Sequence, residues 1–579
     1  MLPGAILLAL LLQITGSSDP CASIDSSFRL TADPNDSHTS PCKCLIDPVP
    51  ADPNDRLWIG CTGRSLSTVF SALGALNETR VNRVHIWDSQ LNILPTEMFE
   101  KVRPKILIIE NSMTSVIRQN TFSQIGNRLI ELRLRNNALK KNIGPALFKG
   151  LERLQALDLS GNKLMSIKAG DFEALGDLRE LHLNDNIIKE IEDGSFSALS
   201  SLRTLSLQGN QLSTITRDTF KGLDNLEYLY LNHNQIANID WAAFHHLKNL
   251  KHLYLGRNHI TTVDIRGLES LEKLILNNNS IQSLKKVSLK DLPSLAVLSL
   301  DRNSIAEIDD VDLFGLAPST RLESLSLASN NVSRITARAF QHIPSLKTLA
   351  LQNNQLLSLS TGTTPVLKPL RRLSVLLLSG NMLTALREAE LPAGLTVLSV
   401  ARNQISHVDV HAFNEMRLQR LFLNDNRITF LPKGTFDSLD MDVLQAVDLT
   451  ENQWQCVCGE EWLGGWLDKA GERDIGEGAL GCLAASCGDN KKDIDRAAWV
   501  TISASILAIL SILILIAIAF LYIENGQHKG IVSRPFRRVD SDMLKLINEN
   551  EAKSDADRGV EQPKLAKSGD STKKSVRFT

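Results

Sequence analysis

Residues 154–164 read LQALDLSGNKL, and the phrase returns as LRELHLNDNII at 178–188, LRTLSLQGNQL at 202–212, LEYLYLNHNQI at 226–236 and LKHLYLGRNHI at 250–260. The shared pattern is L-x-x-L-x-L-x-x-N-x-L. Its asparagine stands at 111, 137, 162, 186, 210, 234, 258, 279, 303, 330, 354, 381, 403, 426 and 452, most often 24 residues apart. A degenerate first copy, VNRVHIWDSQL at 81–91, has Ser89 in the asparagine position. The sequence therefore contains about sixteen repeats between residues 81 and 454.

Each part of the repeat has a physical role. The alternating L-x-L predicts a short strand whose leucines point into the core. The asparagine amide has donors and an acceptor for backbone groups where the chain turns. An apolar residue and often a Phe follow, as in Ile167 and Phe172, and fill the opposite side. No single repeat buries its own core, so we expect stacked copies to form a continuous solenoid.

This pattern resembles the extracellular leucine-rich repeat family. The resemblance implies an α/β fold, namely a curved solenoid with a parallel β-sheet on its concave face and a disulfide cap at each end. The sequence has no G-x-S-x-G, H-E-x-x-H, P-loop or kinase signature. We therefore expect a binding protein without enzymatic activity, cofactor or metal. His245 and His246 follow Phe244 in a return segment and are interpreted as surface residues rather than metal ligands.

The eight cysteines fall into two groups that flank the repeats, at 21–61 and 456–487. Four cysteines permit three pairings in each group. A zinc site is the alternative, which a secreted context and the lack of a nearby histidine partner disfavour. The family resemblance implies that the first cysteine of each group pairs with the third and the second with the fourth: Cys21–Cys44, Cys42–Cys61, Cys456–Cys482 and Cys458–Cys487.

Two apolar segments predict the membrane topology. The run at 5–14, followed by small residues at 15–18, indicates a secretory signal peptide. Residues 497–523 carry no charge, and about 20 apolar residues suffice to cross a bilayer. Basic residues follow this segment at Lys529, Arg534, Arg537 and Arg538, which places the carboxyl end in the cytoplasm. We therefore predict a single-pass type I protein of the plasma membrane with an extracellular amino terminus.

These features divide the chain into seven segments. We assign a signal peptide at 1–17, an amino-terminal cysteine cap at 18–80, the repeats at 81–454, a carboxy-terminal cysteine cap at 455–490, a stalk at 491–496, a transmembrane helix at 497–523 and a disordered cytoplasmic tail at 524–579. Basic and acidic residues nearly cancel, 63 against 65, so no strong field recruits nucleic acid. Four sequons predict glycosylation, at Asn35, Asn77, Asn278 and Asn331.

The candidate partner site lies at the centre of the repeats. Most outward strand positions of the repeats are small or polar, and the exception is the centre, where three of the four tyrosines of the chain gather in two neighbouring repeats. Aromatic residues and arginine are enriched in binding hot spots. A ladder of rings that only stabilises the sheet is the alternative. The predicted patch consists of Arg203, Tyr228, Tyr230, His252, Tyr254 and Arg257.

The tail contains two short motifs. Lys574, Val576 and Phe578 resemble the docking motif of the type-one protein phosphatase, whose ligands add a strand to a sheet edge. Asp542, Leu546 and Ile547 resemble an acidic dileucine sorting signal, for which a nascent amphipathic helix is the alternative. The tail is too short for the signalling (TIR) domain of a Toll-type receptor, so likeness to that class is confined to the ectodomain.

The whole chain resembles the simpler leucine-rich repeat adhesion proteins of the capricious, tartan and connectin kind. The resemblance implies a surface protein that binds an extracellular protein ligand or a cell-surface partner, a second copy of itself included. An alternative is an innate-immune or signalling co-receptor that binds a soluble ligand and signals through a partner.

Overall fold

The computed structural model describes residues 20–30, 42–47, 56–140, 143–455, 462–470 and 474–475. The chain divides into two compact units, 1–485 and 486–579, and all described residues belong to the first. The predicted signal peptide, the carboxy-terminal cysteines, the stalk, the span at 497–523 and the tail with both its motifs lie outside the described residues. Within the described ranges, no helix combines the length and apolar character needed to cross a membrane.

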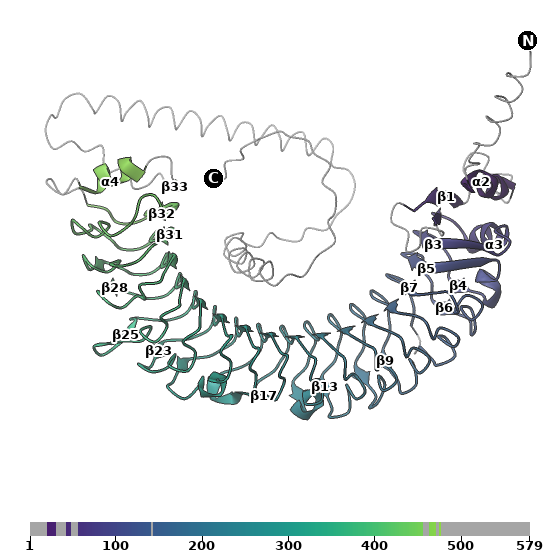
Figure 1. Cartoon of the computed structure of the whole chain (residues 1–579), viewed down its shortest axis with the longest axis horizontal. Helices are drawn as coiled ribbons and strands as arrows, with labels where there is room; N and C mark the ends of the chain where they lie inside the picture. Colours follow the sequence, from purple (N-terminus) through teal and green to yellow (C-terminus); the bar gives the residue numbers. More distant parts are fainter. Residues whose placement is uncertain are drawn as a thin grey trace, which may run out of the picture. The chain divides into compact units, whose positions relative to one another are not determined.

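One sheet of nineteen strands runs through this unit and lines the concave side of a curved solenoid (Figure 1). β1 pairs with β2 in the antiparallel sense, and every later neighbour pair is parallel. The strands are β1 (Cys42–Ile46), β2 (Leu57–Thr62), β3 (Thr79–Trp87), β5 (Val102–Glu110), β7 (Glu131–Arg133), β8 (Ala156–Asp158), β10 (Glu180–His182), β12 (Thr204–Ser206), β14 (Tyr228–Tyr230), β16 (His252–Tyr254), β18 (Lys273–Ile275), β20 (Val297–Ser299), β22 (Ser324–Ser326), β24 (Thr348–Ala350), β27 (Val375–Leu377), β29 (Val397–Ser399), β31 (Arg420–Phe422), β32 (Ala446–Asp448) and β33 (Asp474–Ile475). From β3 to β32 there is one strand for each predicted repeat.

Short elements form the convex side. Parallel two-residue or four-residue strands pair there as β4 (Ile93–Leu94) with β6 (Val116–Ile117), β9 (Ser166–Ile167) with β11 (Glu190–Ile191), β13 (Thr214–Ile215) with β15 (Asn238–Ile239), β17 (Val263–Arg266) with β19 (Val287–Lys290), β21 (Glu307–Ile308) with β23 (Arg334–Ile335), and β28 (Ala385–Leu386) with β30 (His407–Val408). A hairpin joins β25 (Ser360–Thr361) to β26 (Thr364–Pro365). The 3-10 helices are η1 (Thr96–Phe99), η2 (Trp241–Phe244), η3 (Leu284–Lys286) and η4 (Phe314–Leu316).

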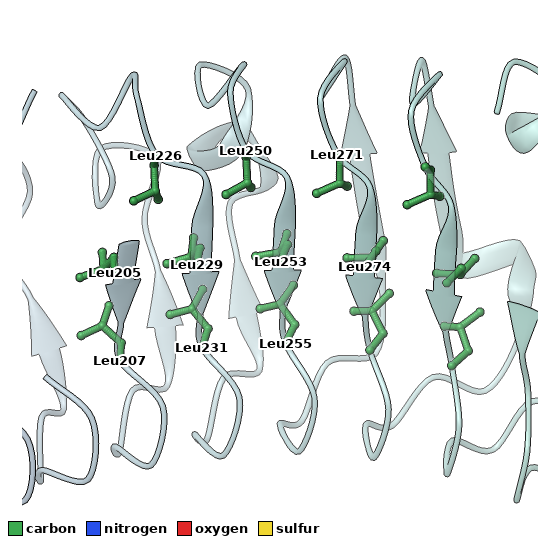
Figure 2. Close-up of a cluster of buried hydrophobic side chains, with 14 of the residues drawn as sticks. Leu205, Leu207, Leu226, Leu229, Leu231, Leu250, Leu253, Leu255, Leu271 and Leu274 are labelled. Carbon is green, nitrogen blue, oxygen red and sulfur yellow. The ribbon is translucent and has the colours of Figure 1, made fainter. Parts of the chain in front are cut away.

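The leucines of the repeat phrase form the core. Figure 2 shows them in rows, each leucine beside its equivalent in the next repeat, as in Leu205, Leu229, Leu253 and Leu274. These side chains are fully buried. Because the repeat leaves its leucines open to the neighbour on each side, the core is continuous only when repeats stack.

The asparagine ladder takes the predicted role. The Asn210 amide nitrogen donates to the carbonyl oxygens of Leu183 (2.9 Å) and Leu207 (3.0 Å), one in the preceding repeat and one in its own. The Asn210 carbonyl oxygen accepts from the backbone nitrogen of Ile188 at 3.0 Å. Each asparagine thus satisfies buried backbone groups of two repeats at once.

The structure corrects the assignment of Asn111 to this ladder. Asn111 is exposed with φ of 50°, and the buried ladder position is the next residue, Ser112. The Ser112 hydroxyl donates to the Glu110 carbonyl at 2.8 Å and accepts from the backbone nitrogen of Ser89 at 3.3 Å. The first two repeats therefore both use serine. A hydroxyl is shorter than an amide and makes fewer bonds, and the asparagine beside it in sequence concealed the shift by one residue.

A column of phenylalanines runs along the convex side of the core. Phe172 lies between Phe148 and Phe196, with ring centroids 6.1 and 6.0 Å away. Between Phe244 and Phe340 the same position, ten residues after the asparagine, is held by buried leucines. These leucines are Leu268, Leu289 and Leu313.

Caps cover both ends of the core. At the amino end, Cys21 pairs with Cys44 and Cys42 with Cys61, which is the pairing that the family resemblance implies. These disulfides tie α2 (Pro20–Leu30) and β1 to β2, and α3 (Leu66–Gly74) follows. At the other end, α4 (Trp462–Ala470) places the rings of Trp462 and Trp466 5.9 and 4.7 Å from that of Phe436.

Candidate concave-face binding site

Four of the six predicted patch residues form one cluster on β14 and β16. The two strands pair in register, with Tyr228 opposite His252 and Tyr230 opposite Tyr254. On each strand the central leucine points into the core, so the aromatic residues on either side of it point into the concavity. The rings of Tyr230 and Tyr254 stack with centroids 4.8 Å apart, and Tyr228 meets His252 edge to face at 5.0 Å. We call these four residues the tyrosine cluster.

The rings stabilise one another and remain partly exposed. Stacked and edge-to-face pairs contribute about 0.5–1.5 kcal/mol each beyond their buried area. Burial, and next the neighbouring Tyr254 and Tyr228, raise the pKa of Tyr230 above 10.0, while Lys273 lowers it. The cluster is therefore preordered, and it presents amphipathic rings that bind with little further loss of side-chain entropy.

A row of charges borders the cluster where the strands begin. Glu227 accepts from Lys251 Nζ at 2.7 Å and lies 3.4 Å from Arg203 Nη1. The hydrogen bond to Glu227 raises the pKa of Lys251. These side chains line a polar recess of about 390 Å³ that spans four repeats. Arg203 is thus a charged neighbour of the cluster, held by Glu227.

Arg257, the sixth predicted residue, lies beyond the carboxyl end of its strand. Arg203 immediately precedes its parallel strand, whereas Arg257 follows β16 in a turn with φ of 54°. Burial lowers the pKa of the His233 imidazole, and the positive charge of Arg257 lowers it further. Parallel strands therefore place the two arginines at opposite ends, with the tyrosine cluster between them.

A second aromatic cluster lies at the amino-terminal end of the concave face, which sequence reasoning missed. Trp58 on β2 and His85 on β3 have ring centroids 6.4 Å apart, and those of His85 and Trp87 are 4.5 Å apart. The expectation that aromatic concave residues gather only at the centre is therefore wrong. The alternation H-I-W in the degenerate first copy at 85–87 was the available signal. We call Trp58, His85 and Trp87 the tryptophan platform.

The other predicted sites are surface positions. Of the sequons, Asn77 and Asn331 are exposed and Asn278 is partly exposed, whereas Asn35 lies outside the described residues. Glycosylation stays a prediction. His246 Nε2 lies 2.8 Å from the Phe220 carbonyl oxygen in the return segment, a contact between neighbouring repeats.

The fold and its partly exposed concave rings define a leucine-rich repeat solenoid, a scaffold for protein interaction that is typically non-enzymatic. The sequence matches the family described as Leucine rich repeat over residues 105–164, 176–236, 225–279, 269–318, 320–383 and 393–454. The chain belongs to this family.

A relative matches nearly the whole length of the chain. It is P-granule-associated novel protein 1 of Caenorhabditis elegans, 49% identical over 99% of this chain and 98% of its own. Among solved structures, Toll in the Drosophila Toll–Spatzle complex is 20% identical with a TM-score of 0.55, covering 75% of this chain and 67% of its own. A leucine-rich repeat protein of Leptospira interrogans is 24% identical with a TM-score of 0.52, covering 70% and 91%. Both structural likenesses show the fold alone.

Proposed function

We propose that this protein is a single-pass type I surface protein that recognises a protein partner, on another cell or in the same membrane, through its concave face. The observation that carries the proposal is the tyrosine cluster, in which four partly exposed rings lie in two paired rows. Rings of this kind are typical anchors at the centre of interfaces. The tail, in this proposal, sorts the protein or recruits a phosphatase.

Two further candidates compete with adhesion. A co-receptor for a soluble ligand would use the same concave surface. The name of the worm relative ties that protein to P granules, and 49% identity over almost the full length makes granule association the other candidate. The three differ in where the repeats reside and in what they bind.

The first test is accessibility of the amino end. An epitope tag placed after residue 18 of the full-length protein should be labelled by antibody on intact cells. Tag labelling that requires permeabilised cells, together with a granular pattern, would contradict the surface proposal and favour the granule.

The second test is binding by a multimerised ectodomain, residues 19–490. We expect it to bind cells that express the full-length protein or a neighbouring cell type. Tyr228→Ala combined with Tyr254→Ala should abolish binding without a large loss of thermal stability. Phe314→Ala, which removes an exposed ring from the convex side, is the matched control and should bind normally. Binding only to a secreted protein would favour the co-receptor, and stable variants that still bind would exclude the tyrosine cluster.

A further inference from the structure

The tryptophan platform is built on the widest part of the sheet. β3 and β5 have nine residues each, whereas most later strands have three. A Cβ placed on Gly60 would lie 3.2 Å from the Trp87 ring, so glycine lets this indole close over β2. The platform is therefore a broad aromatic surface that the amino-terminal repeats specifically accommodate.

Polar contacts hold the platform in place. His85 Nε2 lies 2.8 Å from Glu110 Oε1. The Arg83 guanidinium lies 6.0 Å from the Trp58 ring and 3.5 Å from buried Asp47, which fixes it over the indole. Among the described residues, the buried Trp58 Nε1 has no hydrogen-bond partner. Rings fixed in this way lose little entropy on binding.

The platform and the tyrosine cluster are separated by the width of one ordinary protein interface. Six strand-to-strand steps lead from β3 to β14 through β5, β7, β8, β10 and β12. At about 4.8 Å per step the distance along the sheet is about 29 Å. A standard interface covers about 800 Å² per partner, which corresponds to a patch of similar width.

The strip between the two clusters is occupied by charges that neutralise one another. Arg133 pairs with Glu131, and Arg135 pairs with Asp158. His182 lies 3.7 Å from Glu180. Each pair keeps one partly exposed member, and the pairs repel neither sign of charge, so they can border a partner without adding much affinity. The strong contacts are therefore expected at the two aromatic ends.

We propose that the tryptophan platform is a second anchor for the same protein partner that binds the tyrosine cluster. The partner is a folded domain, since a surface that reaches both clusters across the sheet has the size of one standard interface between folded proteins. Its surface presents two apolar projections about 29 Å apart. This inference rests on the proposed function of the concave face.

The test begins with the full-length protein on cells. Trp87→p-benzoylphenylalanine and Tyr254→p-benzoylphenylalanine are photo-crosslinked separately, and Trp241→p-benzoylphenylalanine on convex-side η2 is the control. We expect the same protein to be crosslinked from positions 87 and 254 and not from 241. The protein captured from position 254 is then purified as the probe for affinity measurements.

Affinity decides the proposal. Trp87→Ala should weaken binding of that probe about thirtyfold, as truncation of a hot-spot tryptophan does. Trp87→Leu keeps apolar cover over Gly60 and should also weaken binding, while Trp241→Ala should not. Unchanged affinity for both Trp87 variants, with loss in Tyr254→Ala, would overturn the second anchor and leave the proposed function intact. No specific crosslink from position 254, or unchanged affinity in Tyr254→Ala, would overturn both.

Discussion

The ladder asparagine is the residue on which each repeat depends most for polar satisfaction. Its side chain is buried, so truncation leaves a buried backbone N–H without a partner and removes one of the donors to the carbonyls that the side chain contacts. Serine at Ser89 and Ser112 shows that a hydroxyl is tolerated where the repeats join the amino-terminal cap. The cost of a substitution therefore depends on how many of the three backbone contacts the new side chain replaces.

Asn210→Ala should destabilise the repeat array by about 2–3 kcal/mol, because it leaves the buried Ile188 N–H without its acceptor and removes one of the two asparagine donors to each of the Leu183 and Leu207 carbonyls. Asn210→Ser should cost less. Guanidinium unfolding of residues 19–490 measures both, with exposed Ser213→Ala as the control. An equal loss for alanine and serine would contradict the hydrogen-bond explanation.

Tyr230 should ionise at a higher pH than an exposed tyrosine does. Its pKa is raised by burial and then by Tyr254 and Tyr228, so the folded protein retains this proton above pH 10.0, where an unfolded tyrosine loses it. The associated stability is present below pH 10.0 and is lost as the pH rises through the folded pKa. Near-ultraviolet titration should show a late step that Tyr230→Phe removes. A single step near pH 10 for all three tyrosines would show that the rings are more solvated than the structure indicates.

At the scale of the elements, the phenylalanine column links neighbouring convex segments. The rings lie about one strand spacing apart, and where the column is interrupted leucine holds the same position. The position therefore requires a large apolar side chain, and stacking between neighbouring rings adds further stabilisation.

Phe172→Ala should cost about 3–5 kcal/mol, because the surrounding strands cannot close the cavity. Phe172→Leu should cost roughly 1.5 kcal/mol or less, as Leu268, Leu289 and Leu313 suggest. Thermal unfolding compares the two variants. If leucine were as costly as alanine, specific ring stacking rather than filled volume would hold the column.

The sequence predicts elements better than it predicts surfaces. The repeat phrase fixes strand, core leucine and ladder asparagine because each follows from a local spacing. It failed at Asn111, where a neighbouring asparagine concealed Ser112. The prediction also did not distinguish the end of the strands at which Arg257 lies from the end at which Arg203 lies. The tryptophan platform was missed because β2 carries no repeat phrase, so only its pairing with β3 brings Trp58 to His85.

At the scale of the whole repeat array, stability is close to a sum of the stabilities of the repeats and the contacts between neighbours. Such an array opens most easily at its ends, which is why the caps matter beyond their size. At the amino end two disulfides and α2 close the core. At the carboxyl end α4 does so with tryptophans, and Trp462 Nε1 also donates to the Leu431 carbonyl at 3.1 Å.

Trp466→Ala should therefore unfold the array from its carboxyl end. The side chain is 9% exposed and its ring lies 4.7 Å from that of Phe436, so its loss uncovers the last column of the core at a cost of about 3 kcal/mol. Hydrogen exchange should rise in the repeats around β31 and β32 and stay unchanged around β3 and β5. Phe430→Ala, which removes a ring that is 49% exposed in the same region, controls for aromatic loss alone and should leave exchange unaltered. A uniform rise across all repeats would instead mean that the repeat array unfolds as one cooperative unit, in which case a substitution in either cap would weaken the tyrosine cluster and the tryptophan platform equally.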